Sequence, residues 1–262
     1  MRLIFYRHGD PDYAIDNLTE QGKIEAELLA SQIKSFGLDD IYVSPLGRAQ
    51  ATAEYSLKVL GRDDAVVCDW LKEFPALFDP NVADEATKKA YATELKYNEE
   101  TNQYDKRIVW DMLPSYYGSH PELFDVNGWR DSELVKASNM CEVYDYVVSS
   151  FDKLLADYGY ERNGNIYKVK ENNDKVLGFF CHFGITSVLL SHLWNVSPFV
   201  PMQFLAMAPT SVTEVVTEER EKGIAIFRTL RIGDTTHLTI GGEKPSFSAR
   251  FCEKFENMDE RH

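Results

Sequence analysis

Short apolar runs alternate with segments of helical periodicity in the N-terminal part of the chain, and this alternation most restricts the possible fold. Residues 3–6 are apolar and end in a Gly/Pro turn, which predicts a buried strand. A helix is predicted from Thr19 to Gly37, because its apolar residues recur at the spacing of one buried face: Ile24, Leu28, Leu29, Ile33 and Phe36. Further strands at 41–43 and 66–68 flank a second helix. This order predicts βαβ units and a parallel sheet.

The C-terminal part of the chain repeats the pattern once and then changes it. An apolar run at 176–181, a turn at 182–184 and a helix through Trp194 form the strongest βα unit. Residues 211–219 and 223–234 alternate apolar and polar side chains, which predicts an antiparallel hairpin at the edge of the sheet. We therefore expect an α/β fold with three layers (α/β/α) and a mostly parallel central sheet.

Residues from about 75 to about 138 are interpreted as an insertion into a single domain that spans 1–262. Their apolar residues are too sparse for a core of their own, so we expect this segment, with one amphipathic helix near 83–95, to form a lid. Its aromatic residues either recognise an organic substrate or only pack the lid, and both interpretations stay open: Trp110, Tyr116, Tyr117, Phe124 and Trp129. Arg107 and Arg130 could bind a second anionic group of the substrate.

The charge balance limits the partners. With 28 Lys and Arg against 42 Asp and Glu, the net charge is −14 at pH 7, which disfavours binding to nucleic acid or to an anionic membrane. An anionic substrate must therefore be bound by a local cationic pocket. No apolar run has the length of a signal peptide or a membrane span, so we expect a cytoplasmic protein. The cysteines are far apart, which predicts reduced thiols rather than a zinc or redox site: Cys68, Cys141, Cys181 and Cys252.

Unusual polar residues stand at three of the predicted βα junctions. Arg7 and His8 follow the first strand in the sequence FYRHGDPDY, Arg48 opens the second helix, and His182 follows the late strand. In open α/β sheets, ligands bind at the carboxyl ends of the strands. We therefore expect these four side chains to converge there.

These residue types suit the transfer of a phosphoryl group. Arginine offers a planar fork of donors that binds phosphate oxygens and stays charged. A neutral histidine can attack phosphorus and form a covalent intermediate, and a second histidine can donate to the oxygens in the transition state. The helix that begins after His182 adds free N–H groups that favour an anion. Since the arginines supply the positive charge, no metal or other cofactor is implied.

The segments FYRHGD, SPLGRAQATA and FFCHFG, in this order, resemble the histidine phosphatase superfamily, also called the phosphoglycerate-mutase-like proteins, in the branch of small-molecule phosphatases and cofactor-dependent mutases. NLTEQGKIEAELLA is similar to a helix start of that branch, and SVTEV and RIGDTTHL are similar to its C-terminal hairpin and tail. The resemblance covers about residues 1–73 and 176–238. It implies that His8 is the phosphorylated nucleophile and that the phosphoryl group is bound by Arg7, Arg48 and His182.

Glu73, in the sequence LKEF, stands where this family often has the proton donor to the leaving oxygen. A carboxyl group suits that role if burial raises its pKa. A surface glutamate is the alternative interpretation. Asp10, two residues after His8, is the competing acid, although an aspartate at such a place more commonly caps a turn.

Two positions differ from the family pattern. Phe183 separates His182 from Gly184, whereas the family commonly has glycine directly after this histidine. After Arg-His-Gly, mutases usually carry a Ser and an Asn, but this chain has Asp-Pro-Asp-Tyr at 10–13, and Asn17 is displaced. The second difference weakens the case for a mutase and favours a phosphatase that hydrolyses a phosphorylated small molecule, whereas Phe183 is the one feature that favours a binding module without turnover. A cofactor-dependent phosphoglycerate mutase and a non-catalytic phosphate-binding regulatory module are the alternatives.

Overall fold

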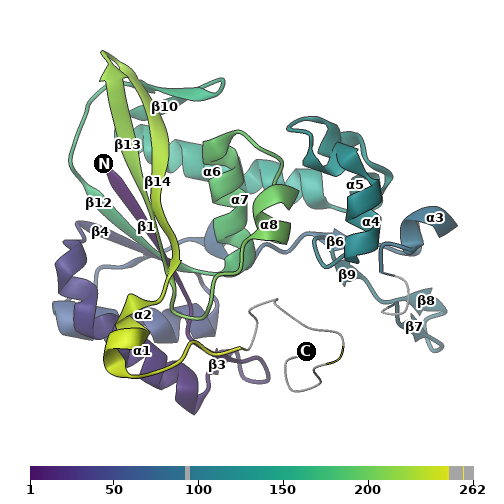
Figure 1. Ribbon diagram of the computed structural model, residues 1–262, viewed down its shortest axis with the longest axis horizontal. Coiled ribbons are helices and arrows are strands. Elements are labelled where there is room, and N and C mark those ends of the chain that lie inside the picture. The colour runs from purple at the N-terminus through teal and green to yellow at the C-terminus, as the bar shows by residue number, and fades with distance from the viewer. Residues whose placement is uncertain (92–94, 248–255, 257–262) are drawn as a thin grey trace. The chain divides into compact units, whose positions relative to one another are not determined.

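The computed structural model describes residues 1–91, 95–247 and 256, and its main feature is an eight-stranded mixed sheet (Figure 1). From one edge of the sheet to the other, the strands are β10 (Tyr160–Asn163), β11 (Ile166–Val169), β14 (Ile224–Asp234), β13 (Val212–Glu221), β1 (Arg2–Arg7), β12 (Val176–Cys181), β4 (Asp40–Val43) and β5 (Val66–Val67). The α/β class that the sequence predicts is confirmed.

The two halves of the sheet differ in strand direction, so the sheet is mixed rather than mostly parallel. Parallel pairing runs from β1 through β12 and β4 to β5. On its other side, β1 pairs antiparallel with β13, and the antiparallel half continues through β14 and β11 to β10. The predicted hairpin is β13–β14, but its expected location at the sheet edge is wrong, because the β10–β11 hairpin lies beyond it. The parallel half carries the predicted βα junctions.

Helices α1 (Glu20–Gln32) and α2 (Gly47–Leu60), with the 3-10 helix η1 (Ile33–Phe36), pack on one face of the parallel half. Gly37 ends η1 in the left-handed region at φ 67°, where glycine is favoured. The core beneath these helices is made of buried side chains from the helices and strands: Ile4, Tyr6, Leu29, Ile33, Phe36, Ile41, Val43, Ala53, Val176 and Phe180. Each large apolar side chain buried here contributes roughly 1.5–3 kcal/mol, and together they hold the strand ends in place.

The buried face of α1 contains a carboxylate that the apolar spacing does not anticipate. Ile24 is exposed, contrary to expectation, whereas Glu25 is fully buried. Glu25 accepts hydrogen bonds from the Asp10 N–H at 2.9 Å and from the Ser246 N–H and hydroxyl at 3.2 and 2.6 Å. These three donors satisfy the buried carboxylate, which is why this position tolerates a polar residue.

An aromatic ladder crosses the parallel half of the sheet. Phe179 of β12 is in register with Phe5 of β1 and Tyr42 of β4. Its ring stacks on both, with centroids 5.1 and 5.3 Å apart. These stacked cross-strand pairs stabilise the three strands whose carboxyl ends carry the candidate site.

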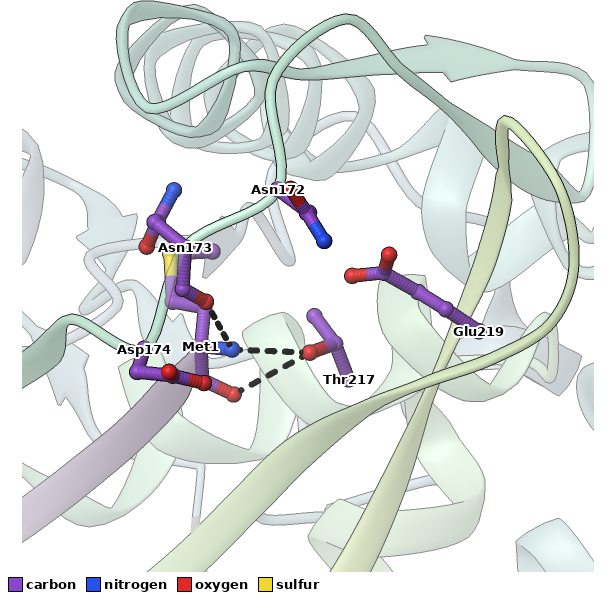
Figure 2. Close-up of a pocket in the computed structure, with 6 residues that line it drawn as sticks. All are labelled: Met1, Asn172, Asn173, Asp174, Thr217 and Glu219. Carbon is purple, nitrogen blue, oxygen red and sulfur yellow. Dashed lines mark hydrogen bonds between the residues drawn. The ribbon is translucent and has the colours of Figure 1, made fainter.

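The amino end of β1 is held in a small pocket, shown in Figure 2. The Met1 amino group donates to the Asn173 carbonyl and to the Thr217 hydroxyl, both at 2.8 Å. The side chains of Asp174 and Glu219 also line this pocket. Burial lowers the pKa of the amino group, and the charges of Glu219 and Asp174 oppose that effect. This pocket lies at the opposite end of β1 from Arg7 and His8.

By internal contacts the chain divides into two compact units. Unit 1 comprises Met1–Glu73, Asp152–Thr186 and the described residues from Ala206 onward, and it contains the eight-stranded sheet. Unit 2 comprises Phe74–Phe151 and Ser187–Leu205. It joins the predicted insertion to a later segment of the chain.

Unit 2 is built from short elements. Its strands form two small antiparallel pairs, β6 (Leu77–Phe78) with β9 (Arg107–Ile108) and β7 (Tyr97–Asn98) with β8 (Gln103–Tyr104). Its short helices are α3 (Glu85–Lys88), α4 (Pro114–Ser119), η4 (Pro121–Phe124), η5 (Gly128–Asp131), α5 (Glu133–Lys136) and α8 (Phe199–Phe204). Of the helix expected near 83–95, the structure has the single turn α3, and residues 92–94 lie outside the described part.

The remaining elements are α6 (Met140–Asp157), α7 (Phe183–Trp194), η2 (Asp69–Leu71) and α9 (Thr236–Gly241). No helix in the described ranges is long and apolar enough to span a membrane. Three of the four cysteines, Cys68, Cys141 and Cys181, are free thiols, and Cys252 lies outside the described residues.

Candidate active site

The carboxyl ends of β1, β12 and β4 lie side by side and bring together the polar residues of the three βα junctions. Arg7, the last residue of β1, is in register with Cys181, and the His8 N–H donates to the Cys181 carbonyl at 3.0 Å. His182 follows β12 directly, and its ring centroid lies 5.1 Å from that of His8. Arg48 stands in the first turn of α2, after β4. All four side chains are buried and belong to unit 1.

His8 is held as a neutral imidazole with a defined tautomer. Its Nδ1 lies 2.7 Å from the Gly9 carbonyl oxygen, which can only accept, so Nδ1 carries the proton and donates. The lone pair is therefore on Nε2. Burial lowers the pKa of His8 well below its usual value, and the charges of Arg7 and Arg48 lower it further, against the opposing effect of the Gly9 bond. A neutral imidazole with a lone pair on Nε2 is the nucleophilic form of histidine.

His182 is oriented by Ser44, a residue that sequence reasoning missed. The Ser44 hydroxyl oxygen lies 2.7 Å from His182 Nε2 and accepts the Leu46 N–H at 3.2 Å. When the Ser44 hydroxyl donates its own proton to Nε2, the proton of the neutral ring lies on Nδ1. Nδ1 is buried and has no hydrogen-bond partner among the described residues. Burial, followed by the charges of His8, Arg48 and Arg7, lowers the pKa of His182 well below its usual value.

Arg7 is buried between backbone and an aromatic ring. It donates to the Met207 carbonyl through Nη1, and its guanidinium carbon lies 5.8 Å from the centroid of the Phe183 ring. Burial lowers the pKa of Arg7, and the charge of Glu73 acts in the opposite direction. Phe183, the departure from the family pattern, is itself buried. In this chain it provides an aromatic face for the arginine cation.

Glu73 lies at the start of α7. Its Oε1 accepts the Gly184 N–H at 2.8 Å and the Ile185 N–H at 3.3 Å. These are the helix N–H groups expected from the sequence to favour a phosphate anion, and here a carboxylate oxygen of the chain accepts them. This backbone contact holds Glu73 at the first turn of the helix that follows His182, and the charge of Glu73 acts on Arg7.

Asp10 is tied into the turn that follows His8. Its carboxylate accepts the Thr19 hydroxyl at 2.7 Å, and its carbonyl accepts the Thr19 N–H at 3.0 Å. This arrangement matches the turn-capping interpretation of Asp10. It also brings the His8 turn against α1, where a Cβ on Gly22 would lie 2.2 Å from the Asp10 carbonyl oxygen.

Arg48 is held by residues that sequence reasoning did not select. Its Nη1 donates to Asp16 at 2.6 Å, and its guanidinium carbon lies 5.4 Å from the centroid of the Tyr13 ring. Thr52 accepts the Gly9 N–H at 2.9 Å and donates to the Arg48 carbonyl at 2.8 Å, which ties the His8 turn to α2. No local pattern marks these residues, because the contacts of Asp16 with Arg48 and of Thr52 with Gly9 join segments that are distant in sequence.

The aromatic residues proposed for specificity belong to unit 2, and most of them are buried there. Trp110 stacks on Phe74, Tyr116 on His120, and Trp129 packs against Tyr144 and Phe199. Tyr117 and Phe124 are the partly exposed members of the set, and they contact each other and Phe204.

The two arginines considered for a second anionic group also belong to unit 2, and each pairs with an acid. Arg107 bonds Asp111 at 2.7 Å, and Arg130 bonds Asp145 at 2.6 Å. Within the described ranges, no group of three or more His, Cys, Asp or Glu side chains could hold a metal ion.

Comparison with known proteins gives one family and several related folds. Residues 3–105 match the family model of the histidine phosphatase superfamily (branch 1). Among solved structures, one similar chain is a mutant phosphoserine phosphatase from Entamoeba histolytica in complex with phosphoserine. It is 19% identical to this chain, with a TM-score of 0.53. The match covers 90% of this chain and 98% of that chain. A mycobacterial glucosyl-3-phosphoglycerate phosphatase with inorganic phosphate is 16% identical (TM-score 0.53, 90% and 98% covered). At these identities, the likeness shows the fold. No curated protein sequence matches this chain.

Proposed function

We propose that this chain is a metal-independent phosphatase that hydrolyses a phosphomonoester through a phosphohistidine intermediate, since residues 3–105 match the family model of the histidine phosphatase superfamily (branch 1). The observation that carries the proposal is the state of His8. This histidine is buried and neutral, its Nδ1 donates to the Gly9 carbonyl, and its Nε2 lone pair is left for attack. Two arginines and a second neutral histidine surround it, as the binding of a phosphoryl group requires.

In the first step, His8 Nε2 attacks phosphorus. A P–N bond forms, the bond from phosphorus to the leaving oxygen breaks, and Glu73 transfers its proton to that oxygen. The positive charges of Arg7 and Arg48 and the Nδ1–H of His182 stabilise the phosphoryl oxygens as charge reorganises. The alcohol product then departs.

In the second step, water replaces the alcohol. Glu73, now a carboxylate, accepts a proton from the water as the water oxygen attacks phosphorus and the P–N bond breaks. Inorganic phosphate leaves, and His8 returns to its neutral form. Glu73 suits both steps because its Oε1 is held by the Gly184 and Ile185 N–H groups, which fixes the carboxyl group at the start of α7, directly after His182 in the sequence.

The related structures support a phosphorylated small molecule as the substrate. The Entamoeba histolytica phosphatase was crystallised with phosphoserine and with 3-phosphoglyceric acid, and the mycobacterial phosphatase with inorganic phosphate. We extend only this chemical class to the present chain.

The test is phosphate release from a panel of phosphomonoesters by the wild-type protein and His8→Ala, with and without EDTA. We expect turnover that survives EDTA and falls to background in His8→Ala, while His192→Ala, a histidine substitution outside the site, retains it. A brief incubation with substrate should also give an acid-labile phosphoprotein in the wild type only. Activity in folded His8→Ala equal to the wild type would contradict the nucleophile assignment.

The same panel separates the alternatives. Conversion of 3-phosphoglycerate that depends on added 2,3-bisphosphoglycerate would identify a mutase instead. Binding of phosphate without turnover of any ester would identify a binding module.

A further inference from the structure

Asp16 contacts Arg48 in a way that the proposed reaction does not yet use. It lies between the two-residue strands β2 (Pro11–Asp12) and β3 (Asn17–Leu18), and both of its carboxylate oxygens are engaged at the start of α2. Oδ1 accepts from Arg48 Nη1 at 2.6 Å, and Oδ2 accepts the Gly47 N–H at 2.7 Å. We propose that Asp16 is a positioning residue, which holds the Arg48 guanidinium in the orientation that binds the phosphoryl group. This inference rests on the proposed function of the site.

The backbone around Asp16 is built for this contact. Asp16 has φ 47°, in the left-handed region that few residues other than Gly, Asn and Asp adopt readily. A Cβ on Gly47 would lie 2.1 Å from the Asp16 carbonyl oxygen, so only glycine allows the loop and the helix to approach this closely. The chain therefore accepts an unfavourable backbone conformation and a glycine in the first turn of α2 to bring this carboxylate to Arg48.

The contact leaves one edge of the guanidinium for a ligand. A guanidinium binds two oxygens of a phosphate along an edge formed by two N–H groups. Asp16 holds Nη1, while the buried Nε has no hydrogen-bond partner among the described residues. The Nε–Nη2 edge is thus the one that remains for a phosphoryl group, and an unpartnered buried donor indicates that a ligand completes it. The centroid of the Tyr13 ring lies 5.4 Å from the guanidinium carbon of Arg48, and this contact further limits the orientations of the guanidinium.

The negative charge of Asp16 also repels a bound phosphate, so two effects oppose each other. The Asp16 side chain is 41% exposed, and water and salt screen its repulsion of a nearby anion. Its hydrogen bond to Arg48, whose side chain is 10% exposed, fixes a cation that is itself buried. Asp16 orients the buried guanidinium of Arg48, whereas its repulsion of phosphate comes from its own exposed carboxylate and is screened. We therefore expect the positioning effect to exceed the repulsion.

The experiment measures binding of inorganic orthophosphate to the full chain by isothermal titration calorimetry. Asp16→Asn keeps the left-handed backbone accessible and the amide oxygen for the Gly47 N–H, but it removes the charged bond to Arg48. We expect orthophosphate affinity to fall about 10-fold, the usual effect of losing a hydrogen bond to a charged group. Asp12→Asn is the matched control, because Asp12 lies in the same small hairpin and its carboxylate bonds the Ala14 N–H. That variant should bind orthophosphate within about 2-fold of the wild type.

Two further variants test whether Asp16 acts through Arg48. Combined with Arg48→Ala, the Asp16→Asn change should cause little additional loss of orthophosphate affinity. Asp16→Gly, which fits the backbone without any side chain, should lose at least as much affinity as Asp16→Asn. A merely structural role would instead lower the thermal unfolding temperature and leave the affinity of the folded protein unchanged.

The outcomes separate this inference from the proposed hydrolysis. Unchanged or tighter orthophosphate binding in Asp16→Asn would overturn the positioning role, as would full additivity with Arg48→Ala. If the wild type binds orthophosphate but hydrolyses no ester, the proposed hydrolysis fails while the Asp16 result still decides the inference. If the wild type binds no orthophosphate, the inference is wrong, and phosphate release from the ester panel still decides the proposed hydrolysis.

Discussion

Replacement of Ser44 by alanine tests how the second histidine is prepared for catalysis. The hydroxyl lies 2.7 Å from His182 Nε2, and by donating to it the hydroxyl would place the ring proton on Nδ1, the nitrogen that we assign to the phosphoryl oxygens. Ser44→Ala keeps the histidine but leaves Nε2 without this partner. The neutral ring can then carry its proton on either nitrogen, and its orientation is no longer held by the hydroxyl.

The expected magnitude follows from what remains in the variant. Removing a donor to a developing anion completely, as in His182→Ala, typically costs about 10²- to 10³-fold in kcat. Ser44→Ala retains the donor in part of the population, so we expect a smaller loss in kcat/KM, about 10- to 100-fold, which corresponds to roughly 1.4–2.7 kcal/mol. The buried Nε2 loses its partner, so the free energy of unfolding should also fall, by about 1–3 kcal/mol.

Steady-state kinetics on the best ester of the panel, combined with urea unfolding, checks both values. Ser56→Ala is the matched control, because Ser56 is also fully buried in unit 1 but its hydroxyl has no hydrogen-bond partner in the described structure. The double variant Ser44→Ala/His182→Ala should be no less active than His182→Ala alone. Wild-type kcat/KM in Ser44→Ala, or losses that simply add in the double variant, would refute the role assigned to this hydroxyl.

Two other predictions concern packing and pH. Gly22→Ala should destabilise the protein by about 1–3 kcal/mol and lower kcat/KM, because the new Cβ would lie 2.2 Å from the Asp10 carbonyl oxygen in the turn after His8. Urea unfolding checks the loss of stability. Gly118→Ala is the control, because a Cβ added at Gly118 would meet no neighbouring atom within 4 Å. Burial lowers the pKa of His237 to about 4 in the folded protein. Between pH 6.5 and 4, the unfolded chain therefore binds a proton at this histidine more readily than the folded protein does. The contribution of neutral His237 to the free energy of unfolding should be fully present above pH 6.5. It should fall by at most about 3 kcal/mol as the pH is lowered toward 4. The free energy of unfolding should depend less steeply on pH in His237→Gln than in the wild type. An equal slope in the two proteins would show that His237 titrates at its usual pKa.

The parts of the fold that follow local rules could be predicted from the sequence. The apolar run at 176–181 coincides with β12, and the helix ends at Gly37 and Gly61 are both left-handed glycine caps. These features depend on hydrophobic spacing and on the conformational freedom of glycine, which a single segment reveals. The position of the β13–β14 hairpin in the sheet depends instead on whether other strands pair with its outer strand. The short, polar β10–β11 pair gave no strong strand pattern, so its place beyond the hairpin was missed.

The candidate site shows the same division. Arg7, His8, Arg48 and His182 could be selected because the carboxyl ends of parallel strands meet at one edge, so a residue's place after a strand predicts its neighbours. Asp16 and Ser44 could not, since each acts through a side chain from another segment, 32 residues away for Asp16 and 138 for Ser44. Their functional signal is a distance between atoms rather than a spacing in sequence.

The proposed function requires a chain with a net charge of −14 to bind an anion, and the charges of the candidate site are consistent with it. Each site arginine is accompanied by a carboxylate, Arg48 by the bonded Asp16 and Arg7 by the nearby charge of Glu73. Both histidines are neutral because burial and the arginines lower their pKa values. The charges of these side chains are therefore close to balanced, and we expect a phosphoryl group to be attracted by the donors of the site rather than by a broad positive field. Protonation of Glu73 removes one of the two opposing charges. In the proposed reaction, the proton that Glu73 gives to the leaving group is thus the same proton that makes the pocket favourable for phosphate.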